Sequence, residues 1–369
     1  MLKRIEDKVH SGRRLTKKEA LKLFESDDIF LTGRLASHVA GKKNGKKAYF
    51  IRNRHINPTN ICVNRCRFCA FSRSKGQEGA FELTIEEIIG KLRGRQSGTG
   101  SRKAEDGKPG TAFSEVHIVG GLHPDWPFEY YLEMVSAIKR HFPKLHIKAF
   151  TAVEVDYMSK INGMGLRETL RALKTAGLGS MPGGGAEIFD EGIRNRLCPE
   201  KISGSRWLDV MEAAHGAGIR TNATMLYGHI ENYTHRVDHL LRLRELQDRT
   251  GGFQAFIPLA YHPRNTRMQG EYTSGLDDLR TVAISRLVLD NFDHIKAYWV
   301  MLGEKISQLA LMFGADDIDG TIIEEKITHA AGALTGEHLT ADQLAHMIRK
   351  AGKVPVERDS FYKRAGKSG

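Results

Sequence analysis

The chain has 369 residues, 40% of them hydrophobic, enough for one large barrel domain or two ordinary domains, and it has no apolar run of about 18 residues that would span a membrane. Its formal net charge is +12, but Lys and Arg are spread along the chain without a dense stripe, so we expect a surface that attracts anionic metabolites rather than a nucleic-acid partner. Its four cysteines and its polar, charged start, unlike a signal peptide, favour the reducing cytoplasm.

The first predicted elements lead into the cysteines. Thr16–Glu19 has the pattern of a capping box, and apolar residues follow it at helical spacing, which predicts a helix. After a turn over 41–47, Ala48–Ile51 is typical of a short strand. The cysteine segment comes next, so we expect it to form a loop at the end of a strand.

The middle of the chain alternates strand-like and helical patterns. Apolar runs predict strands at Val116–Val119, Ile147–Phe150, Ile219–Leu226, Phe253–Ile257 and Ile295–Val300. Helical periodicity predicts helices at Ile85–Leu92, Tyr130–His141, Arg167–Ala176, Arg206–Ala217, Val237–Asp248 and Leu276–Asn291. This alternation indicates an α/β fold, a parallel (β/α) barrel that is complete or partly open, with its site at the C-terminal ends of the strands. An open doubly wound sheet is the alternative.

We expect three parts in the chain. These are an N-terminal helical extension over 1–46, the barrel over 47–335, and a C-terminal helical extension over 336–369 that packs on the barrel. The segment 94–114 is rich in Gly, Ser, Lys and Pro, which predicts a mobile surface insertion. A second capping box, Thr340–Gln343, opens the helix of the last part.

Three cysteines carry the clearest chemical signal. Cys62, Cys66 and Cys69 have the spacing Cys-x3-Cys-x2-Cys. Three thiolates leave one iron of a 4Fe-4S cube open to an outside molecule. A zinc site would need a fourth ligand, for which His55 is the only close candidate, and electron-transfer clusters normally take four thiolates. Cys198 is a candidate for a fourth ligand, but it stands alone before Pro199, which favours its interpretation as a buried small hydrophobe.

This motif, with the aromatic Phe68 before its last cysteine, resembles the signature of the radical S-adenosylmethionine superfamily. The resemblance implies a TIM-barrel-like fold, chelation of S-adenosylmethionine by the open iron, and its cleavage to methionine and a 5'-deoxyadenosyl radical. It also implies an external one-electron donor such as flavodoxin or ferredoxin. Gly120-Gly121 matches the glycine-rich stretch near the methionyl amino group, although Gly-Gly after a strand is often only a turn. Glu154 is a candidate for the ribose hydroxyls or the methionyl ammonium, or else a solvated loop carboxylate.

A narrower resemblance covers nearly the whole chain. The sequence is similar to the aminofutalosine synthase family of the futalosine route to menaquinone. The residues that carry this similarity are His55–Asn60, Cys69–Arg73, Gly120–Pro124, Lys148–Glu154, Pro182–Glu187, Ala223–His229 and Glu324–Ile327. The cyclic dehypoxanthinyl futalosine synthases and the radical enzymes of deazaflavin-chromophore synthesis are the alternatives; they favour Asn where this chain has His123.

The resemblance implies that S-adenosylmethionine is a substrate as well as the radical source. The adenosyl radical adds to 3-[(1-carboxyvinyl)oxy]benzoate, the aryl group migrates and a carboxylate is lost, giving 6-amino-6-deoxyfutalosine. Such a site needs cations for two carboxylates. Arg54, Arg73 and Arg286 are the candidates, because a guanidinium binds a carboxylate in a bidentate way, and Arg73 is favoured by its place after Cys69.

Further candidates lie in the matched motifs. His55 and His123 are preferred to His229 as groups that donate a proton or position the substrate. The list of candidate cofactor contacts is completed by Gly183–Gly185, Glu187, Asn222 and Thr224. A rival hypothesis from another class is a nucleic-acid-binding protein with a structural cluster, motivated by the net charge and the 94–114 segment. Nothing in the sequence predicts an oligomeric state.

Overall fold

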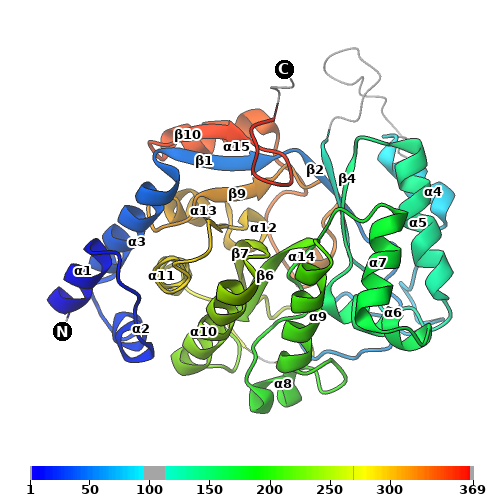
Figure 1. Ribbon diagram of the computed structural model, residues 1–369, viewed down its shortest axis with the longest axis horizontal. Helices are drawn as coiled ribbons and strands as arrows, with labels where there is room; N and C mark the ends of the chain where they lie inside the picture. Colours follow the sequence, from blue (N-terminus) through cyan, green and yellow to red (C-terminus); the bar gives the residue numbers. More distant parts are fainter. Residues whose placement is uncertain (1, 95–112, 269, 366–369) are drawn as a thin grey trace.

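The computed structural model describes residues 2–94, 113–268 and 270–365 (Figure 1). The predicted mobile insertion at 94–114 therefore lies almost wholly outside the described residues. The chain begins with three helices, α1 (Leu2–His10), α2 (Lys17–Phe24) and α3 (Ile29–Asn44), which lie together at one end of the molecule (Figure 1). The predicted capping box at the start of α2 is confirmed: Thr16 accepts from the Glu19 amide and Glu19 accepts from the Thr16 amide.

A seven-stranded parallel sheet forms the centre of the fold and confirms the predicted α/β barrel class. Its strands follow one another in chain order: β2 (Asn53–Ile56), β3 (Glu115–Ile118), β4 (His146–Ala149), β5 (Ser180–Met181), β6 (Arg220–Tyr227), β7 (Phe253–Ala260) and β8 (His294–Ile295). Helices lie between them in sequence: α4 (Ile85–Leu92), α5 (Phe128–His141), α6 (Ala152–Ile161), α7 (Leu166–Ala176), α8 (Glu191–Leu197), α9 (Gly204–Gly216), α10 (Tyr233–Thr250) and α11 (Gly275–Val288). Parallel neighbours need such crossovers, which is why the two patterns alternate.

The gap between β8 and β2 is filled by a segment near the end of the chain. Strand β9 (Asp317–Gly320) meets β8 through a single bridge, Lys296 with Asp317, and Ile323 just beyond it bridges to Arg54 of β2. Strand β9 also belongs to a second sheet of order β10-β1-β9, with β1 (Lys47–Ile51) and β10 (Val354–Glu357). The barrel is therefore completed by single bridges rather than by a continuous ladder.

Four further helices follow β8 in the described part of the chain. They are α12 (Trp299–Leu302), α13 (Glu304–Ala310), α14 (Ile327–Ala330) and α15 (Ala341–Lys350). The second capping box is confirmed, since Thr340 caps α15 together with Gln343. Only Ile295 of the predicted strand Ile295–Val300 lies in a strand, because β8 ends there and Trp299 begins a helix. The predicted division into three parts stays a prediction.

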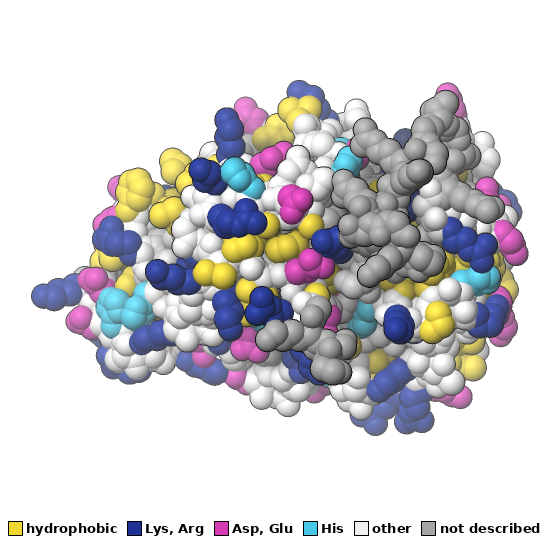
Figure 2. Space-filling model, turned by 90° about the horizontal axis from the view of Figure 1, so that it is seen from above, with side chains coloured by type: hydrophobic (Ala, Val, Ile, Leu, Met, Phe, Trp, Pro, Cys, Tyr) yellow, Lys and Arg dark blue, Asp and Glu magenta, His cyan; other side chains and the backbone are white. Residues whose placement is uncertain are grey.

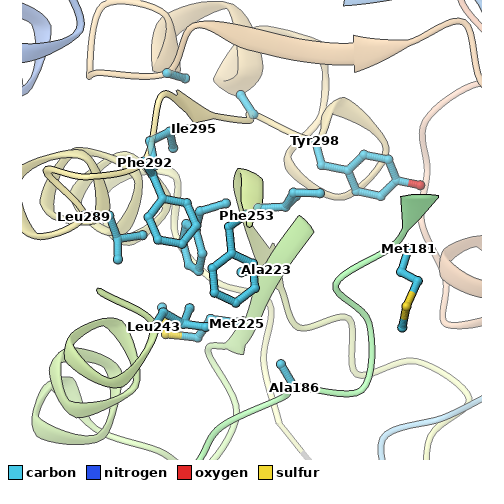
Figure 3. Close-up of a cluster of buried hydrophobic side chains, with 14 of the residues drawn as sticks. Met181, Ala186, Ala223, Met225, Leu243, Phe253, Leu289, Phe292, Ile295 and Tyr298 are labelled. Atoms are coloured by element: carbon cyan, nitrogen blue, oxygen red, sulfur yellow. The ribbon is translucent and has the colours of Figure 1, made fainter. Parts of the chain in front are cut away.

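Apolar side chains fill the space between the sheet and its outer helices. Figure 3 shows Phe253 of β7 and Phe292 facing each other, with Met225 and Leu243 beside them. The rings of Phe253 and Phe292 stack with their centroids 5.3 Å apart. Full burial of one such side chain stabilises the fold by about 2 to 3 kcal/mol. This packing fixes β6 and β7, whose far ends carry part of the site described next.

Among the described residues, no helix could cross a membrane. On the face in Figure 2, Lys and Arg side chains are interspersed with acidic, apolar and neutral ones. That mixture is unlike the basic stripe of a nucleic-acid-binding face.

Candidate active site

A cavity of about 320 Å³ opens inside the barrel, within the size range of ligand pockets. It is lined by residues from the strands and from the loops at their C-terminal ends. Among them are most of the candidates named from the sequence: Cys62, Cys66, Phe68, Cys69, His55, Gly120, Gly121, Glu154, Gly183–Gly185, Glu187, Asn222 and Thr224. Arg54, Arg73, His123, His229 and Arg286 are not in the lining. Side chains far apart in the sequence are thus brought to one place.

The cysteine loop is fixed by its backbone. The Cys62 amide donates to the carbonyl of Arg73 at 3.0 Å, and the Cys69 amide donates to the carbonyl of Cys66 at 3.1 Å. Asn60, just before the loop, accepts from the Phe81 amide at 2.8 Å through its side-chain oxygen. The four cysteines are free thiols, so the three of the motif can all serve as ligands.

Two of these thiols have raised pKa values. The contact with the Cys198 thiol and then burial raise the pKa of Cys66, while burial raises the pKa of Cys62. A buried thiol gives up its proton when a cation takes its place, as iron does in a cluster. Among the described residues no three His, Cys, Asp or Glu side chains converge on one point for a single ion.

Glycines let the end of β3 approach the cysteine loop. A Cβ atom on Gly121 would overlap the carbonyl oxygen of Ile61, and one on Gly120 would lie 3.1 Å from the carbonyl oxygen of Thr59. Glycine is therefore required here by the packing of two backbone segments. The Gly120 amide donates to Glu154 Oε1 at 3.2 Å, so this segment is also tied to the next strand end.

Glu154 is a buried carboxylate, so its interpretation as a solvated loop residue is wrong. It is 5% exposed and forms a capping box with Thr151, whose amide donates to Oε2 at 2.7 Å. Burial raises the pKa of this carboxyl to about 7, against the opposing effect of its hydrogen bonds. A carboxylate held in this way at the cavity wall suits a cationic or hydroxyl-bearing ligand.

The glycine loop after β5 lies against β6. The carbonyl of Gly183 accepts from the Thr224 hydroxyl at 2.6 Å, and a Cβ on Gly183 would lie 2.8 Å from the Cα of Ala223. Glu187 follows and pairs with Lys201, at 2.5 Å between Oε1 and Nζ. Lys201 also lies 4.9 Å from the centre of the Phe68 ring. Sequence reasoning missed Lys201, because nothing in its local sequence marks it.

Arg73 and His123 lie beside the cavity rather than in its lining. The Arg73 guanidinium donates to the carbonyls of Ala70 and Ser72, both at 2.9 Å, and so holds the turn that follows Cys69. His123 stacks on Trp126 with the ring centres 4.6 Å apart, and its Nε2 lies 2.6 Å from Glu82 Oε2. Through these contacts, both residues hold in place the segments that lie next to the cysteine loop.

Arg286 lies outside the cavity, which corrects the expectation that it contacts a substrate carboxylate. It is wholly buried in α11 and donates to the carbonyl of Gly314 at 2.9 Å, and it pairs with Asp316. Arg54 is also outside the lining, with Glu324 as its partner at 3.3 Å. All the guanidinium candidates thus have protein partners.

The inner wall of the cavity holds polar residues that sequence reasoning missed. They are Glu115 and His117 of β3, Lys148 of β4, Lys296 after β8, Asp319 of β9 and Glu325. A signal was present: polar residues alternate with apolar ones in Glu115–Ile118 and His146–Ala149, where an outward face would be covered by helices. Such alternation in a barrel strand indicates a polar interior.

A parallel ring of strands with three cysteines at its mouth defines a class of iron–sulfur enzymes, and comparison with known proteins identifies it. Residues 56–243 match the radical SAM superfamily, and residues 250–367 match the CofH/MqnC C-terminal region. The chain belongs to the radical SAM superfamily, whose members hold a 4Fe-4S cluster and use S-adenosylmethionine.

Its relatives place it among enzymes of the transferase type. The chain is 46% identical to the aminodeoxyfutalosine synthase of Thermus thermophilus over 97% of this chain and 94% of that one. It is 43% identical to the enzyme of the same name from Streptomyces coelicolor, over 97% and 92%. It is 42% identical to a 5-amino-6-(D-ribitylamino)uracil–L-tyrosine 4-hydroxyphenyl transferase of Methanosarcina barkeri, over 94% and 90%.

Solved structures support the fold. Methylornithine synthase superimposes with a TM-score of 0.72 at 18% identity, covering 96% of this chain and 97% of that one. The FeFe-hydrogenase maturase of Carboxydothermus hydrogenoformans gives a TM-score of 0.71 at 16% identity, covering 98% and 80%.

Proposed function

We propose that the chain is an aminofutalosine synthase of menaquinone biosynthesis. It would join the 5'-deoxyadenosyl group of S-adenosylmethionine to 3-[(1-carboxyvinyl)oxy]benzoate, with aryl migration and decarboxylation, to give 6-amino-6-deoxyfutalosine. The observation that carries this proposal is the 46% identity to an aminodeoxyfutalosine synthase over nearly the full length of both chains. The predicted cytoplasmic location belongs to the same proposal.

In this proposal Cys62, Cys66 and Cys69 hold three irons of the cluster and leave the fourth open. When bound and reduced by an external donor such as flavodoxin or ferredoxin, the cluster supplies the electron that cleaves S-adenosylmethionine. The support is that all three thiols line one cavity. Cys198 is not among the proposed ligands, although its thiol contacts Cys66.

The walls next to the cysteines would bind and orient S-adenosylmethionine. Gly120, Gly121 and Glu154 lie together where the methionyl end would be held. The Glu187–Lys201 pair, Asn222 and Thr224 line the same cavity, and hydroxyls and ring nitrogens of adenosine would find partners there. Phe68 would provide an apolar surface. Apolar residues around the cavity, such as Val153, Leu226 and Leu259, would exclude water that could quench a radical.

His55 remains the candidate for a direct contact with the substrate, because it lines the cavity and is 6% exposed. Arg73 and His123 are reassigned as positioning residues, since they act on the segment around the cysteines rather than in the cavity. Arg286 has no place in the reaction.

A second candidate is transfer of the 4-hydroxyphenyl group of tyrosine to 5-amino-6-(D-ribitylamino)uracil, the reaction named for relatives at 42% and 37% identity. The cyclic dehypoxanthinyl futalosine synthase reaction is a third, favoured by the match of residues 250–367 to the CofH/MqnC region.

The test is anaerobic incubation of the reconstituted, reduced protein with S-adenosylmethionine and the carboxyvinyloxy-benzoate, followed by mass spectrometry. We expect aminofutalosine and methionine. Parallel incubations would contain tyrosine with the ribitylaminouracil, or dehypoxanthinyl futalosine. A product only in one of these would replace the proposed substrate while keeping the radical chemistry. Intact S-adenosylmethionine under strong reduction would contradict the whole proposal.

A further inference from the structure

A row of polar side chains crosses the barrel one layer inside the cysteine loop. His55 of β2 is paired in register with His117 of β3, and His117 is paired with Lys148 of β4. Residues in register on neighbouring parallel strands point to the same face of the sheet. All three line the cavity, as does Lys296 just after β8. We call these four residues the inner row.

The inner row is electrostatically separate from the cysteine end. Its two lysines pair with buried acids: Lys148 Nζ lies 2.8 Å from Glu115 Oε2, and Lys296 Nζ lies 3.2 Å from Asp319 Oδ1. The groups that act on the pKa of His117 are His55, Lys148, Glu115 and Lys296. Those that act on Cys66 are Cys198, Lys201 and Glu187, a different set. The cavity therefore has two chemically distinct ends.

The histidines of the inner row have unused hydrogen-bonding capacity. Their ring centres lie 4.6 Å apart, and the Nε2 atom of each is buried without a partner among the described residues. Burial lowers the pKa of both rings, so each is neutral at pH 7 and carries one N–H. Leaving a buried polar atom unpaired costs about 1 to 3 kcal/mol, which a ligand that accepts hydrogen bonds would recover.

The charge at this end sets the class of that ligand. Lys148 and Lys296 each pair with one acid, Glu115 and Asp319, and each ammonium group has further N–H donors, so the inner row suits a ligand with one negative charge better than a phosphate with two. The charge of Glu325, also in the lining, is offset by His329, whose Nδ1 lies 3.2 Å from Oε2 and whose pKa is raised to about 9. A carboxylate matches two N–H donors and two nearby ammonium groups.

We propose that the inner row binds the carboxylate of an aromatic acid substrate, with the ring against the apolar wall formed by Ile257, Tyr298 and Met301. This rests on the proposed function insofar as the synthase substrate carries a carboxylate on its benzene ring. It assigns to His117 and the two lysines the role that the sequence suggested for arginines. His55 and His117 donate to the carboxylate oxygens, while Lys148 and Lys296 offset its charge.

The experiment measures binding, so that it does not depend on turnover. The cluster-reconstituted protein with S-adenosylmethionine is titrated by calorimetry with 3-hydroxybenzoate and with 3-hydroxybenzamide, which keeps the ring but lacks the charge. We expect the acid to bind at least about tenfold more tightly than the amide, one charge-assisted hydrogen bond being worth about 1.5 to 3 kcal/mol. His117→Gln is expected to remove most of that preference.

The matched control is His215→Gln. His215 is a histidine outside the cavity lining, and its ring nitrogens are hydrogen-bonded to the hydroxyls of Thr250 and Thr221 at 2.7 and 2.8 Å. It should leave the preference for the acid unchanged. If His117→Gln does not fold, as judged by its cluster absorbance, His55→Gln tests the same contact.

Equal binding of acid and amide by the wild-type protein would overturn the proposal, as would a preference that survives both His117→Gln and His55→Gln. The result separates this inference from the proposed function. An inner-row-dependent preference for benzoate in a protein that makes no aminofutalosine supports the subsite and refutes the assigned reaction. Aminofutalosine synthesis with an unchanged KM in both variants refutes the subsite alone.

Discussion

The cysteines in and beside the cavity differ in their proposed roles. Cys66 and Cys198 touch, yet only Cys66 belongs to the triplet on the loop after β2. We expect alanine at Cys62, Cys66 or Cys69 to abolish the iron–sulfur absorbance of reconstituted protein or to leave it unstable, because each thiolate binds its own iron. The measurement is the anaerobic absorbance spectrum with iron and sulfide analysis.

Cys198→Ala is the matched control and should keep the cluster. A full, active cluster in any of the three motif variants would show that the ligand assignment is wrong. Loss of the cluster in Cys198→Ala alone would make Cys198 a ligand instead of a packed neighbour.

His329 provides a test of the structure through pH. Its hydrogen bond to Glu325 is the main cause that raises its pKa to about 9, and Nδ1 lies 3.2 Å from Oε2 of that acid. A histidine whose folded pKa is raised stabilises the protein fully below its unfolded pKa of about 6.5, and this contribution is lost as the pH rises through about 9. Because the ring is partly solvated, we expect about 1 kcal/mol.

The measurement is the free energy of unfolding of the wild type and of His329→Gln between pH 6 and 10. The difference should be largest near pH 6 and should vanish near pH 10. His346→Gln, at an exposed position of α15, should show no such trend. A difference that grows with pH would contradict the pairing.

The parts of the site that form short sequence motifs could be predicted from the sequence. The cysteine triplet, Gly120-Gly121 and Glu154 all came from short motifs and all line the cavity. The alternation of polar and apolar residues marks His117 and Lys148 as facing the interior, but that they meet each other depends on the register of β3 with β4, which local spacing does not give. Arg286 was misplaced because a helical position does not reveal which buried acid a guanidinium will meet.

Helix α11 is anchored by that same arginine. Arg286 donates to the carbonyls of Gly314 and Phe292 and pairs with Asp316, so it joins the helix to the segment before β9. Removing one partner of a buried ion pair typically costs about 3 to 5 kcal/mol. We expect Arg286→Met to lower the free energy of unfolding by that amount and to leave KM for the substrate unchanged in the protein that remains folded.

Arg249→Met is the matched control, since Arg249 pairs at the surface with Glu212 at 3.2 Å. Its loss should cost less than about 1 kcal/mol. A large rise in KM for Arg286→Met with normal stability would restore Arg286 to the site.

Elements with strong periodicity were predicted well, and short polar ones were not. Helix Ile85–Leu92 has the predicted bounds. Strands β5 and β8 have two residues each, too few to form a pattern. Strand β2 reads Asn-Arg-His-Ile, with His55 in the cavity lining and Arg54 paired with Glu324, so it does not resemble an apolar buried strand in sequence.

At the scale of the whole molecule, the C-terminal segment packs against β1 and β9. Strand β10 pairs with β1, and Arg358 just beyond it lies 2.7 Å from Asp317 of β9. Tyr362 donates to the same acid at 2.6 Å and stacks on His294. The C-terminal segment therefore neutralises a wholly buried carboxylate next to the inner wall of the barrel.

Truncation after Gly352 should for this reason destabilise the whole protein, because Asp317 would lose its guanidinium and β1 would lose a neighbour. We expect a loss of at least about 3 kcal/mol, seen as a lower melting temperature or as aggregation. Truncation after Ala365 is the control and should be neutral. Equal stability of both truncated chains would mean that the contact of Arg358 with Asp317 does not stabilise the fold.

On each side of the β9 segment, the ring of strands is held, among the described residues, by one bridge only: Lys296 with Asp317, and Arg54 with Ile323. Strands β6 and β7, by contrast, share a long ladder, although β4 and β5 also pair through one residue each. Opening is cheapest where the fewest hydrogen bonds must break, so the amides of His55 and Ala297, bonded to Ile323 and Asp317, should exchange with deuterium sooner than those of β6. Local unfolding would therefore begin beside β9, at the part of the cavity that carries Asp319, while β6 and β7 remain paired.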